Sequence, residues 1–125
     1  MKVETMVLLH NVRSTHNVGS IFRTADAAGV SKILLTGYTP APIDRFGRPQ
    51  KDIAKTALGA EKYLQWEHTK SPVNIIRDLK KEGWVIVGVE QDEKAEDYRE
   101  LHADFKRVFI FGNIVTGKQI GRAHV

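Results

Sequence analysis

The sequence contains no cysteine. This excludes a disulfide framework, a thiolate zinc site, an iron–sulfur cluster and a cysteine nucleophile, and it suits a reducing compartment. No apolar run approaches the roughly 20 residues that span a bilayer. The first residues also lack the basic, apolar and small segments of a signal peptide. We therefore expect a cytoplasmic protein without a transmembrane segment.

An acidic surplus is also missing. The formal net charge is +4, with nine Lys and Arg against five Asp and Glu in residues 1–62 and ten against ten in residues 63–125. A positive surplus confined to one half favours a polyanionic partner such as nucleic acid. The length of 125 residues and the 42% apolar content indicate one compact domain.

Alternation of apolar and polar residues is scarce in the segments with strand character, which are continuous apolar runs instead. They are residues 6–9, 33–36, 84–89 and 108–111. Continuous runs are typical of strands covered on both faces, as in parallel sheets flanked by helices. We therefore predict an α/β fold with a mainly parallel sheet and right-handed crossovers.

Two helices separate these strands. The first is predicted over residues 18–28, with Asn17 as a candidate N-cap and Gly29 as the stop. The second begins at Ser71 and Pro72 and ends at Gly83. Residues 38–52 form a long irregular stretch after the second strand, at the carboxyl edge where ligands bind in such sheets.

Residues 11–29 carry the densest pattern. On a helix, Val18, Ile21, Phe22, Ala25 and Ala28 share one face. Arg23 lies roughly opposite, with small neighbours that allow a backbone or a ligand to approach its guanidinium. A surface pair with Asp26 at i+3 is the alternative for Arg23, and a helix cap is the alternative for Asn17.

This run, Asn-Val-Gly-Ser-Ile-Phe-Arg-Thr-Ala-Asp-Ala-Ala-Gly at residues 17–29, resembles motif 1 of the SpoU (TrmH-like) RNA 2′-O-ribose methyltransferases of the SPOUT superfamily. Residues 108–113 are similar to the opening of motif 2, and residues 55–61 to the segment after the RNA-facing loop. The resemblance covers residues 6–113. It implies an α/β-knot fold, a homodimer, S-adenosylmethionine as cofactor, and tRNA or rRNA as substrate.

The resemblance also implies site residues. Asn17 would position the substrate and Arg23 would be catalytic. An arginine stays protonated in proteins, so we expect Arg23 to bind an RNA phosphate rather than act as a free base. S-adenosylmethionine would be held near Val89, Glu90, Phe111, Gly112 and Asn113. A basic rim on the segments leaving the first two strands would bind RNA, and it comprises Arg13, Arg45, Arg48, Lys51 and Lys55.

The C-terminal residues depart from the family. Ile114 stands where motif 2 normally has a glutamate that contacts the catalytic arginine, and motif 3, with its knot-forming segment, is missing. We therefore predict an incomplete methyltransferase domain over residues 1–113, a tail over residues 114–125 that largely does not match the family, and weak or no methyl transfer by this chain. A non-catalytic RNA-binding module is the alternative.

Three other interpretations are disfavoured. Residues 112–118 fit a phosphate-binding G-x-x-x-x-G-K loop, but Gln119 cannot supply the hydroxyl that ligates Mg²⁺. The five histidines show no metal-ligand spacing, so we expect no metal site. A generic α/β protein with a coincidental motif 1 is improbable because the match is long.

Overall fold

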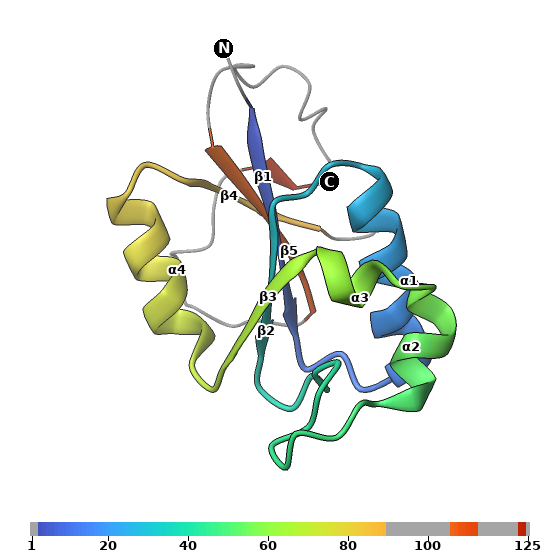
Figure 1. Cartoon of the computed structure of the whole chain (residues 1–125). Helices are drawn as coiled ribbons and strands as arrows, with labels where there is room; N and C mark the ends of the chain where they lie inside the picture. The colour runs from blue at the N-terminus through green and yellow to red at the C-terminus, as the bar shows by residue number, and fades with distance from the viewer. Residues whose placement is uncertain (1–2, 90–105, 113–122, 125) are drawn as a thin grey trace.

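The computed structural model describes residues 3–89, 106–112 and 123–124 (Figure 1). Its six-stranded sheet has the order β3-β2-β1-β5-β4-β6, and every described pair of neighbouring strands is parallel. The strands are β1 (Glu4–His10), β2 (Lys32–Thr36), β3 (Gln65–Thr69), β4 (Val85–Gly88), β5 (Lys106–Phe111) and β6 (Ala123–His124). The helices are α1 (Thr15–Ala27), α2 (Lys51–Ala57), α3 (Ala60–Tyr63) and α4 (Pro72–Lys81). The predicted parallel α/β sheet is confirmed.

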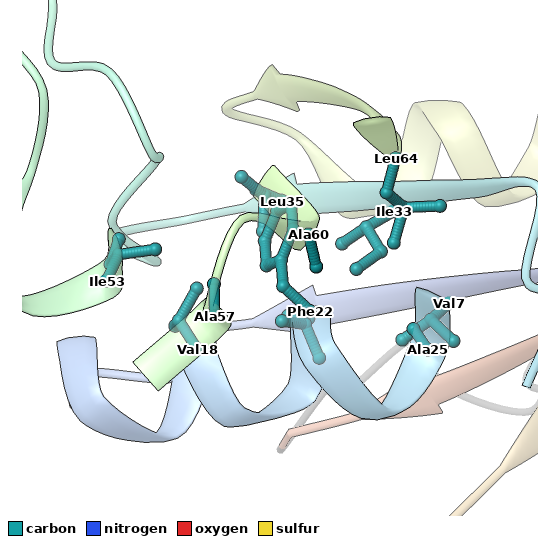
Figure 2. Close-up of a cluster of buried hydrophobic side chains, with 11 residues drawn as sticks. Val7, Val18, Phe22, Ala25, Ile33, Leu35, Ile53, Ala57, Ala60 and Leu64 are labelled. Atoms are coloured by element: carbon teal, nitrogen blue, oxygen red, sulfur yellow. The ribbon is translucent and has the colours of Figure 1, made fainter. Parts of the chain in front are cut away.

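Helices cover both faces of the sheet, which explains the continuous apolar runs. In β1, Val7 and Leu9 point into a core beneath α1, α2 and α3, while Met6 and Leu8 point into a second core beneath α4. Figure 2 shows the first core, in which Phe22 of α1 is fully buried against the sheet. Truncating such a phenylalanine to alanine typically costs about 3–5 kcal/mol.

The structure adds four elements that the sequence pattern did not predict, namely β3, β6, α2 and α3. Strand β3 lies at the edge of the sheet and is mostly exposed, so it lacks an apolar run. Helix α2 begins at Lys51, inside the segment predicted to be irregular, and Gln50 provides no side-chain cap. Its buried Ile53 and Ala57 pack into the core beneath α1. Tertiary packing rather than local sequence therefore stabilises α2.

The start predicted for the first helix is wrong. Helix α1 begins at Thr15, because the Ser14 hydroxyl caps it by accepting a hydrogen bond from the backbone N–H of Asn17 at 3.1 Å. The predicted stop at Gly29 is confirmed, with φ of 82°. For α4 the predicted Ser71 cap and Pro72 start are also confirmed, and Gly83 follows the helix with φ of 92°.

A largely apolar groove of about 450 Å³ runs between α1 and the neighbouring strands. Val18, Phe22 and Ala25 of the predicted apolar face are buried, whereas the half-buried Ile21 and the exposed Ala28 line this groove. Phe109 and Phe111 of β5 line it from the sheet. Among the described residues, no helix has the length and apolarity needed to cross a membrane.

Candidate functional site

The carboxyl ends of the parallel strands meet at one edge of the sheet, where His10 ends β1. Its Nδ1 lies 2.9 Å from the Thr36 hydroxyl at the end of β2. Gly112, just after β5, has φ of 113°, and a side chain there would collide with the His10 carbonyl oxygen. The chain can therefore turn out of β5 only because residue 112 is glycine.

Buried hydroxyl groups fix the loops that leave this edge. The Thr39 hydroxyl donates to the Leu9 carbonyl at 2.9 Å and accepts from the Val12 N–H at 3.1 Å. Asn11, in the left-handed region with φ of 54°, accepts from the Tyr38 N–H at 3.0 Å. The segments after β1 and β2 are thereby joined into one surface. Sequence inspection missed these residues because isolated threonines carry no signal.

Burial lowers the pKa of His10 below its ordinary value, because an imidazolium ion loses solvation at this site. The ring is therefore neutral at physiological pH. His10 is the last residue of β1, and its ring makes the hydrogen bond to Thr36.

Asn17 lies in the first turn of α1, at this edge, and its side chain is exposed. Because Ser14 caps the helix, the alternative of Asn17 as the cap is wrong. Arg23 lies six residues further, about 9 Å along the helix axis. Its side chain is exposed. The ion pairs within the described part of the chain are Lys32 with Glu67 and Arg48 with Asp44, so the alternative of an Arg23–Asp26 ion pair is not supported.

Gly19, between these two residues, is buried against α2. A Cβ at this position would collide with the Thr56 hydroxyl and lie 2.5 Å from the Ile53 carbonyl oxygen. Thr56 also donates to the His16 carbonyl at 3.0 Å. Helices α1 and α2 therefore approach each other closely at Gly19.

Three of the five residues predicted to hold a cofactor are described. Val89 follows β4, and its N–H donates to the Ile110 carbonyl of β5 at 2.9 Å. Phe111 ends β5 and Gly112 follows it, so all three lie at the carboxyl edge. Glu90 and Asn113 lie outside the described residues, as do the predicted domain boundary at 113–114 and Ile114.

The residues of the predicted basic rim are all exposed. Arg13 leaves β1, and its guanidinium lies 5.2 Å from the ring centroid of Tyr38. Arg45 and Arg48 lie 4.9 and 5.0 Å from the ring centroid of Phe46. The other two, Lys51 and Lys55, lie on α2. Tyr38 and Phe46 were not predicted as site residues, although Phe46 stands between arginines in the sequence.

The loop of residues 38–50 reaches beyond the carboxyl edge, below α2 in Figure 1. Asp44 organises its tip. The Asp44 carboxylate accepts from the backbone N–H groups of Phe46 and Arg48, both at 2.9 Å, and from the Arg48 Nε at 3.0 Å. The backbone hydrogen bond from Arg48 is the main reason that the pKa of Asp44 lies below its ordinary value. Arg48 therefore has a structural role besides its charge.

The SpoU rRNA methylase family matches residues 4–118. The chain belongs to this family. A protein of Staphylococcus saprophyticus assigned to the TrmH family of tRNA/rRNA methyltransferases is 33% identical over 112 residues, which are 90% of this chain and 42% of the relative. A tRNA/rRNA methyltransferase homologue of Mycoplasma pneumoniae is 32% identical over 87% of this chain and 43% of its own length. This SpoU chain thus spans about two fifths of the curated relatives it matches.

Solved structures agree with the family and the fold. An rRNA methyltransferase from Sinorhizobium meliloti aligns with a TM-score of 0.71 and 30% identity over 91% of the SpoU chain and 41% of the other. The same kind of enzyme from that organism, with AdoMet bound, aligns with a TM-score of 0.72 and 29% identity over 95% and 41%. The A. aeolicus TrmH/SpoU tRNA modifying enzyme aligns with a TM-score of 0.74 and 22% identity over 98% of the SpoU chain and 61% of the other, and this likeness supports the fold alone.

Proposed function

We propose that this SpoU chain is an S-adenosylmethionine-dependent methyltransferase domain that methylates the ribose 2′-oxygen of tRNA or rRNA. The family match over residues 4–118 carries the proposal, because it includes α1 and the carboxyl ends of the described central strands. The exposed Asn17 and Arg23 on α1 are its reactive surface.

Arg23 holds the RNA in this proposal. Its planar guanidinium is always charged and matches a phosphate with two parallel N–H donors. Bound to the phosphate beside the target ribose, it anchors the nucleotide and stabilises negative charge that develops on the attacking 2′-oxygen. The exposed amide of Asn17, six residues nearer the carboxyl edge, orients the ribose. Placement of the oxygen in line with the methyl group supplies the proximity that the reaction needs.

The cofactor site is proposed for the edge between β4 and β5. Val89, Phe111 and Gly112 lie together there, and Gly112 presents no side chain that would fill the space after β5. This backbone-rich edge fits a small ligand at the carboxyl ends of parallel strands. S-adenosylmethionine supplies an electrophilic methyl group when it is bound.

Labelled methyl transfer tests the proposal. The chain is incubated with bulk tRNA or rRNA and S-adenosylmethionine that carries tritium in its methyl group. We expect weak labelling that exceeds the protein-free background, recovered in dinucleotides that resist alkaline hydrolysis because the 2′-oxygen is blocked. Arg23→Ala should reduce the rate about a hundredfold, since imprecise placement near a reacting centre costs about that much. Label on the bases, or a rate that does not depend on Arg23, would contradict the proposal.

A non-catalytic RNA-binding module is the second candidate. The exposed arginine–aromatic pairs of Arg13 with Tyr38 and of Arg45 and Arg48 with Phe46 favour it, because they provide RNA contacts without a cofactor. RNA binding that persists without S-adenosylmethionine binding would favour this candidate over the methyltransferase.

A further inference from the structure

Two exposed aromatic rings on one loop stand out in the described part of the chain. Phe46 is 67% exposed and Tyr38 is 56% exposed, and both belong to the segment that leaves β2. Exposing a large aromatic ring to water forgoes the free energy of its burial. Neither ring is a core residue, and each has arginine guanidinium groups at 4.9 to 5.2 Å from its centroid.

The tip that carries Phe46 is held in shape before any ligand binds. Asp44 accepts three hydrogen bonds from the tip, and its N–H donates to the Arg48 carbonyl at 2.9 Å. Ile43 and Pro49 form an antiparallel bridge, and the Gln50 N–H donates to the Pro42 carbonyl at 2.8 Å. A ligand that binds Phe46 therefore pays little of the entropy of ordering a loop.

A cavity of about 450 Å³ adjoins the ring. Phe46, Arg45 and Asp44 line it from the loop, and Trp66 and His68 line it from β3. It is of a size that accepts a small planar group, and its walls combine aromatic faces with hydrogen-bonding side chains.

Exposed aromatic rings and guanidinium planes suit nucleobases whose faces are not already stacked on other bases. In an RNA duplex the bases stack on one another, and side chains reach mainly phosphates and the shallow groove. Unpaired bases instead stack on aromatic and arginine side chains. The positive charge of Arg13 and Arg45 adds attraction to the backbone phosphates.

We propose that Phe46, with Arg45 and the adjoining cavity, is a stacking site for one unpaired nucleobase of the RNA, and that Tyr38 with Arg13 stacks a second. This inference rests on the proposed function and refines it. The chain selects single-stranded segments, such as loops, bulges or ends, over helical RNA. Trp66 is half-buried against the first core and forms the wall of the cavity rather than the platform.

The test compares one RNA in two states. A fluorescein-labelled 12-nucleotide RNA is titrated with the chain, either alone or annealed to its complement, and anisotropy is recorded at several salt concentrations. The variants are Phe46→Ala and Phe46→Trp. The matched control is Tyr63→Ala, because Tyr63 is an aromatic ring that is 81% exposed on α3, directly before β3 begins and hence at the opposite edge of the sheet. Circular dichroism verifies that each variant is folded.

We expect the unaltered chain to bind the single strand at least tenfold more tightly than the duplex. Phe46→Ala should weaken single-strand binding about tenfold and leave its salt slope unchanged, because no charge is removed. Phe46→Trp should restore the affinity, and the fluorescence that it adds should be quenched by the single strand. Tyr63→Ala should bind like the unaltered chain.

Each contrary outcome would overturn one proposal or both. Equal affinity for the two RNA states, or equal effects of Phe46→Ala and Tyr63→Ala, would overturn the stacking site while RNA binding stands. Phe46-dependent binding without labelled methyl transfer would overturn the methyltransferase proposal and leave the stacking site in place. Failure of the unaltered chain to bind either RNA would overturn both.

Discussion

Replacing Gly19 with alanine should destabilise the protein, although alanine is the better helix former. In an exposed helix the change would gain about 1 kcal/mol. Here the added Cβ collides with the Thr56 hydroxyl and lies 2.5 Å from the Ile53 carbonyl oxygen. The carbonyl is part of α2 and cannot rotate away, so α1 and α2 must separate over the core that contains Val18. Overpacking of this kind typically costs about 1–3 kcal/mol.

Because one of the two collisions is with a backbone oxygen, we expect a cost in the upper part of this range, about 2–3 kcal/mol, and after subtraction of the helix-propensity gain a net loss of about 1–2 kcal/mol in the free energy of unfolding. Urea unfolding followed by the fluorescence of Trp84 and Trp66 measures it as a lower midpoint at constant slope. Thr24→Ala, on the exposed side of α1, is the control and should be neutral or slightly stabilising.

The double variant Gly19→Ala/Thr56→Ala separates the two collisions. Removing the Thr56 hydroxyl should recover part of the loss, so the two single effects should not add, and the carbonyl collision should keep the double variant less stable than Thr56→Ala alone. A Gly19→Ala protein as stable as the parent would refute the close approach of α1 and α2, and with it the structural explanation for this motif glycine.

Three further outcomes are expected. Replacing Arg45 and Lys51 with glutamine should reduce the salt slope of single-strand RNA binding by about 1.4, two phosphate contacts at about 0.7 each, and an unchanged slope would remove these residues from the interface. Asp44→Asn should weaken single-strand binding although it removes a negative charge, because the tip that carries Phe46 loses its organising carboxylate; tighter binding would contradict this. For His10, the folded-state pKa is below the ordinary 6.5, so the unfolded state binds the proton first. Its contribution to stability is therefore present above about pH 6.5 and is lost as the pH falls through the lowered pKa, and thermal unfolding of His10→Asn should show a smaller loss in that range than the parent.

Much of the fold could be predicted because the central strands of a parallel sheet must be apolar on both faces. The four predicted strands lie within β1, β2, β5 and the region of β4, and the caps of α4 were identified from Ser71 and Pro72. Strand β3 could not be predicted in this way, because an edge strand needs only one partner and one covered face. Helix α2 could not be predicted from its own sequence either, because Ile53 and Ala57 are buried only by packing into the core beneath α1.

The candidate site also combines residues that the sequence could predict with residues that it could not. Charged residues on segments that leave the strands, such as Arg13 and Arg45, could be predicted, because parallel topology brings those segments to one edge. The hydrogen bonds of His10, Thr36 and Thr39 join residues 26 to 30 positions apart, and no local pattern signals them. Asn17 was predicted to be the N-cap because asparagine is a favoured N-cap residue. Ser14, three residues earlier, is the cap instead, because its hydroxyl accepts the hydrogen bond from the Asn17 N–H.

Calorimetric titration of S-adenosylmethionine into this chain tests the methyltransferase assignment most directly. The account predicts a saturable heat with one cofactor molecule bound per chain, displaced by the demethylated product S-adenosylhomocysteine. The contrary result is no binding of S-adenosylmethionine at concentrations up to about 1 mM, while RNA binding is intact; a dissociation constant of about 1 mM corresponds to a binding free energy near −4.1 kcal/mol. That result would contradict the account and identify the chain as an RNA-binding module without a cofactor.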